Sequence, residues 1–207
     1  ARNTAEAVAM ADYKFDDYKS KEKKVFLEEV TLIFNFIDKE FENGFNEGIS
    51  IGNSTILARR LVNEPANVLT PTELAKRVVD LGKEKGLDVE VYESDKIQEL
   101  GMESYLAVAK GSSEPPKFII MRYTGNPGGE TLGFVGKGLT YDSGGLSIKP
   151  TKSMLTMKSD MGGAGSVIGA MAAIAESKLK VNVTAVVAAC ENMIAGNSYK
   201  PGDIINS

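Results

Sequence analysis

The chain contains no histidine among its 207 residues. This absence excludes Ser-His-Asp triads, Cys-His nucleophile pairs and every zinc site that uses imidazole as a ligand. Hydrolytic chemistry in this chain must therefore use carboxylates, lysines, or a metal ion held by oxygen and amine ligands.

The chain also has a single cysteine, no long apolar run and no excess of positive charge. Cys190 is the single cysteine, so it cannot form an internal disulfide, and the apolar residues around it indicate a reduced thiol in the core. No run approaches the roughly 20 apolar residues needed to cross a bilayer, and no signal peptide opens the chain. The net charge of −4 gives no electrostatic case for a nucleic-acid partner. We therefore expect a soluble cytoplasmic protein with no membrane or nucleic-acid partner.

The order of apolar patterns along the chain predicts its fold class. Hydrophobic residues make up 43% of the chain, enough for a sizeable core. The predicted strands are residues 29–34, 87–92, 117–123, 131–135 and 181–189. The predicted helices are residues 36–63, 71–85, 95–101 and 161–178. This alternation predicts an α/β fold with a mainly parallel central sheet flanked by helices, in which 181–189 is a central strand.

The first long predicted helix, 36–63, has the pattern of a connector. Ile37, Phe41 and Phe45 lie four residues apart, which is the spacing of one helical face. Three glycines between residues 44 and 52 follow the same step, and we interpret them as sites of close helix packing rather than ligand binding. This helix is a predicted domain boundary.

The next predicted helix has recognisable signals at both ends. Thr70 is a favourable N-cap, Pro71 suits the first helical position, and Glu73 is placed to complete a capping box. Gly86 can end the helix in the left-handed conformation.

Two lysines and two aspartates lie among glycines in the run from Val135 to Gly163. Lys137, Asp142, Lys149 and Asp160 follow a hydrophobic strand and precede a buried helix. Ligands of α/β proteins bind outside the carboxyl ends of strands, which is where this run is expected to lie as a loop.

The glycines of this run match neither common nucleotide-binding motif. A phosphate loop needs four residues between its first glycine and a Gly-Lys pair, but only two separate Gly133 from Gly136. A dinucleotide fingerprint needs a third glycine where Tyr141 stands.

Asp142 and Asp160 are better explained as hard oxygen ligands of a divalent metal ion. A lysine such as Lys137 can join such a site only as a neutral amine, whereas Lys149 would remain a cation able to polarise a substrate carbonyl. For any one of these residues, a surface salt bridge around a glycine turn is the plainer interpretation. The set at this spacing favours the metal site.

These motifs together resemble one known family. The runs GKGLTYDSGG (136–145), SIK (147–149) and MKSDMGG (157–163) follow the loop NEPANVLTPTELA (63–75). This combination resembles the cytosolic leucyl aminopeptidases, a family of metallopeptidases, in register from about residue 55 to 207.

The resemblance implies a role for each site residue. Lys137, Asp142 and Asp160 would be metal ligands, with Asp142 bridging two ions of zinc or manganese, or of magnesium as a third option. Lys149 would stabilise the tetrahedral intermediate, and Met157 would form a wall of the pocket for the first side chain of the substrate. Met157, Lys149 and Asp142 would thus border the substrate.

The implied activity is that of a two-metal aminopeptidase, which releases N-terminal residues from peptides with a metal-activated water and a leucine-like preference. The resemblance also implies a homo-oligomer, specifically a hexamer. It divides the chain into the end of an N-terminal domain (1–35), a connecting helix (36–63) and the first half of a metallopeptidase catalytic domain (64–207).

The family's second ligand run, of the form Asn-Thr-Asp-Ala-Glu-Gly-Arg, does not occur in these 207 residues. It supplies the second aspartate, a bridging glutamate and an anion-binding arginine. We therefore expect the 207-residue chain itself to have little or no peptidase activity, and its incomplete sheet to leave apolar surface for association. The alternative is a non-catalytic structural or binding subunit with the same fold, although such a protein need not keep both lysines and both aspartates.

Overall fold

The computed structural model describes residues 1–19 and 28–205. The helices in these ranges are α1 (Arg2–Ala11), α2 (Lys39–Asn63), α3 (Pro71–Lys85), α4 (Ser94–Glu99), α5 (Glu103–Ala109), α6 (Thr151–Met154) and α7 (Gly162–Glu176), with a 3-10 turn, η1 (Met157–Ser159). The strands are β1 (Asp88–Tyr92), β2 (Lys117–Thr124), β3 (Thr131–Asp142) and β4 (Asn182–Asn192). None of the helices in the described ranges is long and apolar enough to span a membrane.

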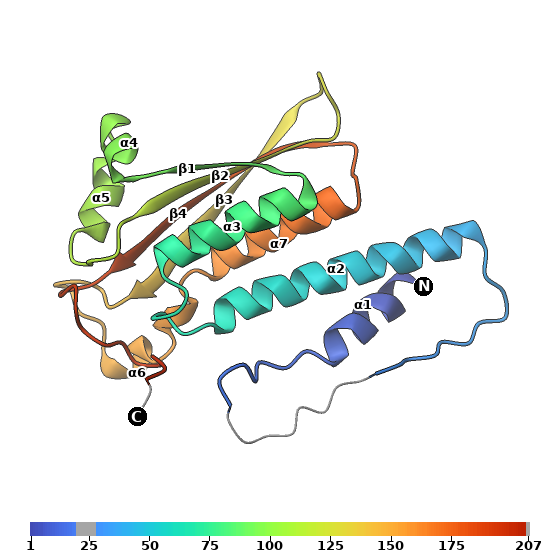
Figure 1. The fold of residues 1–207 in the computed structure, drawn as a ribbon, viewed down its shortest axis with the longest axis horizontal. Helices are drawn as coiled ribbons and strands as arrows, with labels where there is room; N and C mark the ends of the chain where they lie inside the picture. The colour runs from blue at the N-terminus through green and yellow to red at the C-terminus, as the bar shows by residue number, and fades with distance from the viewer. Residues whose placement is uncertain (20–27, 206–207) are drawn as a thin grey trace.

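The strands form one sheet in the order β1-β2-β4-β3, with helices packed against it (Figure 1). The α/β class is therefore confirmed, and β4 is a central strand as expected. The sheet is mixed rather than mainly parallel: β3 and β4 are parallel, whereas β1 pairs with β2 and β2 with β4 in antiparallel ladders. A continuous apolar run indicates a buried strand but carries no information on its direction, which explains the difference.

Helices α3 and α7 cover one face of the sheet and enclose the main core (Figure 1). Ile119 and Met121 of β2, Val187 of β4 and Met171 of α7 are fully buried there. Because side chains alternate along a strand, the residues between these positions point to the opposite face.

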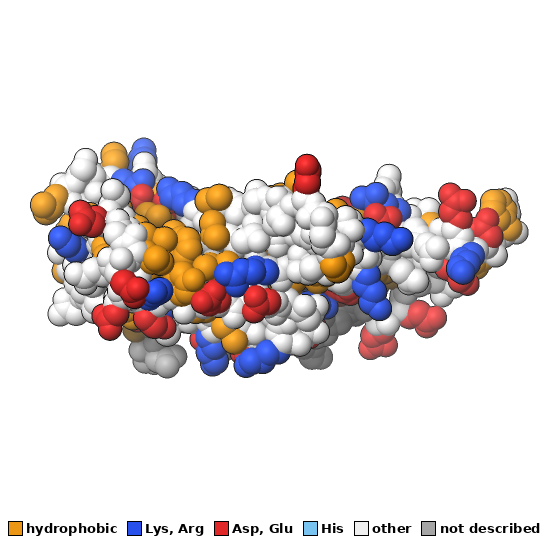
Figure 2. Space-filling view, turned by 90° about the horizontal axis from the view of Figure 1, so that it is seen from above, with side chains coloured by type: hydrophobic (Ala, Val, Ile, Leu, Met, Phe, Trp, Pro, Cys, Tyr) orange, Lys and Arg blue, Asp and Glu red, His pale blue; other side chains and the backbone are white. Residues whose placement is uncertain are grey.

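The opposite face of the sheet is apolar in part, and the view from above shows hydrophobic side chains gathered in a patch (Figure 2). Phe134 of β3 packs against the core, so its neighbour Val135 points away from it and is 82% exposed. Within the described ranges β3 has a strand on one side only, which leaves its other edge unpaired. The expected exposed apolar surface is thus present at β3.

Helix α1 packs along α2 through the glycines of α2 (Figure 1). A Cβ atom added at Gly48 would lie 2.2 Å from the carbonyl oxygen of Arg2, and one at Gly52 would lie 2.7 Å from the Cβ of Ala9. The predicted close helix packing is confirmed at both positions. Helix α1 itself was not expected, because its contact face consists of small residues such as Ala5 rather than bulky apolar ones.

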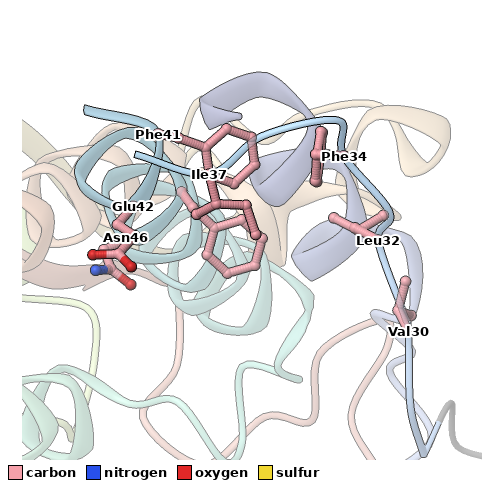
Figure 3. A pocket seen from close by; sticks show the side chains of 8 residues that line it. Val30, Leu32, Phe34, Ile37, Phe41, Glu42 and Asn46 are labelled. Atoms are coloured by element: carbon pink, nitrogen blue, oxygen red, sulfur yellow. The ribbon is translucent and has the colours of Figure 1, made fainter. Parts of the chain in front are cut away.

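The strand predicted at residues 29–34 is wrong. The segment is extended but pairs with no strand in the described part of the chain. Its alternate side chains instead pack on the start of α2, where the rings of Phe34 and Phe41 meet edge to face with centroids 4.4 Å apart (Figure 3). The side chains enclose a groove of about 470 Å³ that is lined by Val30, Leu32, Phe34, Ile37, Phe41, Glu42, Phe45 and Asn46.

Strand β3 is longer than predicted. It continues from Thr131 past residue 135 to Asp142, so that Lys137 lies inside a strand and not in a loop. Glycine-rich sequence lowers strand propensity, but Gly138 lies so close to the carbonyl oxygen of Ala188 in β4 that a Cβ atom would be 2.7 Å from it. Close packing against β4 thus explains a strand that composition alone does not predict.

Helix α3 begins and ends as expected. The Thr70 hydroxyl accepts a hydrogen bond of 3.2 Å from the backbone N–H of Glu73, Pro71 is the first helical residue, and Gly86 is left-handed with φ of 71°. The Glu73 carboxylate pairs with Arg77 at 2.9 Å instead of completing the capping box.

We expect Thr70→Ala to lower the free energy of unfolding by about 1 kcal/mol, because it removes the acceptor for an otherwise unpaired N–H in the first turn. Urea denaturation followed by circular dichroism measures the change. Thr72→Ala, two residues further along the chain, is the matched control. Its exposed side chain donates a hydrogen bond to the partly exposed Glu114, and its loss should change stability by less than about 0.5 kcal/mol. Equal losses in the two variants would contradict the cap.

Candidate metal centre

The candidate residues lie along the second half of β3 and in the segment that follows it. Lys137 is in β3, Asp142 is its last residue, and Asp160 lies between η1 and α7. The start of α7 approaches β3 very closely, since a Cβ atom added at Gly136 would be 2.8 Å from the Cα of Ala164. Only glycine permits this distance, which brings the segment with Asp160 to β3.

Lys137 and Asp160 form an ion pair in which Nζ and Oδ2 are 2.8 Å apart. The lysine side chain is 56% exposed, whereas the aspartate side chain is 19% exposed. Asp160 Oδ2 is buried and accepts no hydrogen bond of good geometry from residues 1–19 or 28–205, so this ammonium contact is its compensation. A buried carboxylate oxygen that lacks a hydrogen-bond donor is suited to a cation.

Asp142 and Lys149 form a second ion pair, with Oδ2 and Nζ 3.0 Å apart. The other oxygen, Oδ1, accepts hydrogen bonds from the Gly144 backbone N–H (2.9 Å) and the Asn192 side-chain amide (2.8 Å). Burial by itself would raise the pKa of Asp142, but the Lys149 ammonium and these two donors outweigh it and lower the pKa below the ordinary value. Asp142 is therefore held as a carboxylate.

The two ion pairs are neighbours. The pKa of Lys149 is raised mainly by its hydrogen bond to Asp142 and, in a smaller part, by the charge of Asp160. Lys149 thus carries its positive charge against Asp142 and within electrostatic reach of Asp160.

The donor set fits a divalent metal ion. Among the described residues no group of three or more His, Cys, Asp or Glu side chains could hold one. The set consists instead of two carboxylates, one of them with an unsatisfied buried oxygen, and the amine of Lys137. Hard carboxylate oxygens suit zinc, manganese or magnesium, so the residues present could form part of such a site.

Met157 opens η1 near these residues and is half-buried. It packs against a small cluster of Ala66, Tyr141 and Met193. This position leaves part of its side chain exposed.

Two residues next to the site were not singled out in the sequence. Asn192 ends β4 and donates its amide to Asp142. Glu191, which is 3% exposed, accepts hydrogen bonds from Ser112 Oγ (2.6 Å) and Lys200 Nζ (3.2 Å). The available signal was a pair of polar residues at the end of a continuous apolar strand, which is the usual place for a ligand site in an α/β sheet.

Cys190 is fully buried and unpaired, as expected for a core thiol. Burial, followed by the nearby carboxylates of Asp142 and Glu191, raises its pKa to about 12. The thiol therefore stays protonated and is no candidate for a nucleophile or metal ligand.

Comparison with known proteins identifies the family of the chain. Residues 56–207 match the profile of the "Cytosol aminopeptidase family, catalytic domain". The chain is 49% identical to a probable cytosol aminopeptidase of Alkaliphilus oremlandii and 52% identical to one of Fusobacterium nucleatum. Each alignment covers 98% of this chain but only 42% of the relative, so the chain spans less than half the length of these proteins.

Solved structures give the same result. The bottromycin maturation enzyme BotP in complex with Mn superposes with a TM-score of 0.84 at 39% identity, covering 98% of this chain and 42% of BotP. A cytosol aminopeptidase from Coxiella burnetii gives 0.78 at 31% identity, over 96% of this chain and 41% of the other. A mutant of tomato leucine aminopeptidase gives 0.82 at 35% identity, over 96% and 39%. The chain belongs to the cytosol aminopeptidase family, and its residues 56–207 match part of that family's catalytic domain.

Proposed function

We propose that this chain carries part of the active centre of a two-metal aminopeptidase that removes N-terminal residues from peptides, with a leucine-like preference. Lys137, Asp142 and Asp160 would hold divalent ions, zinc or manganese with magnesium as a third option. The observation that carries the proposal is the buried Oδ2 of Asp160, which contacts the Lys137 ammonium but accepts no hydrogen bond of good geometry from the described residues. The bound manganese of BotP, a relative in structure, supports it.

The chain's own residues would position the substrate. When bound, the ions would supply a water activated at neutral pH and an electrostatic partner for the carbonyl oxygen. Lys149, held as a cation beside Asp142, would donate a hydrogen bond to the carbonyl of the first peptide bond. Asp142 would present its carboxylate next to Lys149. Met157, with the open part of its side chain, would contact the first side chain of the peptide.

We also propose how this chain fits into a longer enzyme. We propose that the active enzyme contains, in addition to this chain, the family's second ligand run, and we call the two together the longer enzyme. Residues 1–35, 36–63 and 64–207 would be the end of an N-terminal domain, a connecting helix and the first half of the catalytic domain. The names of the relatives support a cytosolic location, and we propose a homo-hexamer.

Metal analysis and a leucyl-anilide assay test this proposal. We expect the longer enzyme to bind Mn²⁺ and to hydrolyse leucyl-anilide, and the 207-residue chain alone to be slower by about a thousandfold. Several kcal/mol of transition-state stabilisation depend on a complete pair of ions, and each 1.36 kcal/mol corresponds to a factor of ten.

The longer enzyme with Asp142→Asn is the control for metal-dependent activity. Metal-free longer enzyme that keeps its full activity would contradict the two-metal proposal. A longer enzyme with neither metal nor activity would instead favour the non-catalytic structural or binding subunit. A 207-residue chain as active as the longer enzyme would contradict the need for the second ligand run.

A further inference from the structure

Asn192 joins the end of β4 to the end of β3 through both its backbone and its side chain. Its carbonyl oxygen accepts hydrogen bonds from the backbone N–H of Ser143 (2.9 Å) and from Ser143 Oγ (2.8 Å). Its side-chain amide donates to Asp142 Oδ1 at 2.8 Å. The backbone contacts fix the two strand ends together, and the amide fixes the carboxylate.

The two oxygens of Asp142 have different partners as a result. Oδ1 accepts from two neutral donors, the Asn192 amide and the Gly144 N–H, which occupy its lone pairs. Oδ2 contacts, among the described residues, the flexible and charged side chain of Lys149. The two neutral donors keep Oδ1 bound to the protein, and they do not repel a divalent ion nearby. Oδ2 is therefore the oxygen available to a cation.

We propose that Asn192 is a positioning residue of the metal centre: its amide holds the Asp142 carboxylate so that Oδ2 is presented to the ion. This inference rests on the proposed function, since it requires that Asp142 binds a metal. Groups that orient a metal ligand in this way commonly change metal affinity by about 10- to 100-fold.

The residue before Asn192 makes the strand end a rigid support. Glu191 points to the other face of the sheet, because consecutive side chains of a strand alternate. Its buried carboxylate is tied to Ser112 and Lys200, which lie on segments before β2 and after β4. The position of the Asn192 amide is therefore determined from both faces of the strand.

The chain contains a matched control at the opposite end of the same strand. Asn182 opens β4 and donates its amide to the carbonyl oxygens of Asn126 (2.6 Å) and Gly129 (3.0 Å). Its own Oδ1 accepts from the Asn126 backbone N–H at 2.9 Å. A substitution there removes three side-chain hydrogen bonds from β4, more than the one lost at Asn192, without touching Asp142.

The test compares Asn192→Leu, Asn192→Ser and Asn182→Leu in the longer enzyme. Leucine has nearly the shape of asparagine without its amide, and both Ser143 bonds remain because they go to the backbone carbonyl of residue 192. The serine variant is smaller and polar, so it provides a folded protein if leucine is not tolerated. Mn²⁺ binding is titrated by electron paramagnetic resonance, which gives the affinity and the line shape of the bound ion, and thermal unfolding is recorded in parallel.

We expect both Asn192 variants to bind Mn²⁺ about 10- to 100-fold more weakly, with an altered line shape, and Asn182→Leu to stay within about threefold of the unchanged protein. Equal Mn²⁺ affinities and line shapes in all four proteins would overturn the role of Asn192 and leave the proposed function intact. An equal loss of Mn²⁺ affinity in the Asn182 variant would show that Asn192 only supports the fold in general. That result would also overturn the proposed role of Asn192. If the unchanged longer enzyme binds no Mn²⁺, both the proposed function and this inference fail.

Discussion

Asp160→Asn is expected to weaken Mn²⁺ binding by the longer enzyme more than about 100-fold, beyond the 10- to 100-fold typical of groups that only support a ligand. The same change is expected to leave the free energy of unfolding of the metal-free chain unchanged or raised. In the described part of the chain, Asp160 Oδ2 is buried and accepts no hydrogen bond of good geometry, and its ion-pair partner Lys137 is 56% exposed and can be solvated by water. When a group is kept for function at a cost in stability, its removal weakens binding but leaves stability unchanged or raised.

Mn²⁺ titration and urea denaturation measure the two effects separately. Asp80→Asn is the control, because Asp80 is an exposed carboxylate of α3 that also pairs with a lysine, at 3.1 Å from Lys83. It should change neither quantity appreciably. A clear loss of stability in Asp160→Asn with unchanged Mn²⁺ affinity would show that the Lys137–Asp160 pair is structural.

Gly136→Ala is expected to destabilise the chain by about 1 to 3 kcal/mol, the usual range for overpacking a tight contact. The new Cβ would lie 2.8 Å from the Cα of Ala164 and 3.0 Å from the carbonyl oxygen of Gly163, both in backbone that cannot rotate away. Helix α7 must then move from β3, and the segment that carries Asp160 moves with it. We therefore expect weaker Mn²⁺ binding as well.

Gly133→Ala in the same strand is the matched control. A Cβ atom there meets nothing within 4 Å, and alanine removes the entropic disadvantage of glycine in a strand. Its stability should be equal to or slightly above that of the unchanged chain in urea denaturation. Similar losses in both variants would show that the close approach of α7 and β3 does not determine the stability of this region.

Local signals explain the parts of the fold that the sequence predicted well. The start of α3 at Thr70 and its end at Gly86 depend on residues within a few positions of each other, and both were predicted correctly. The apolar runs of β2 and β4 were equally clear. Strand direction, the length of β3 and helix α1 were not predictable in the same way, because they depend on which segments pack together.

The candidate site was likewise predicted where local patterns sufficed, and not where it depends on which segments pack together. The spacing of Lys137, Asp142, Lys149 and Asp160 singled out residues that the fold brings together in two adjacent ion pairs. Which lysine pairs with which aspartate was not predicted, since it depends on the approach of α7 to β3. The contact of Asn192 with Asp142 depends on the register of β3 against β4, which places these two residues opposite each other. No local pattern reveals that register.

The unpaired edge of β3 has a practical consequence for handling the chain in solution. No strand of the described ranges covers this edge, and Val135 on it is largely exposed, so the edge can accept a strand from a second molecule. Such pairing grows with concentration, and it would cover the strand that ends at Asp142. Dilute samples and short storage are thus preferable in metal titrations, because aggregated chains would bury the ligands that the titration counts.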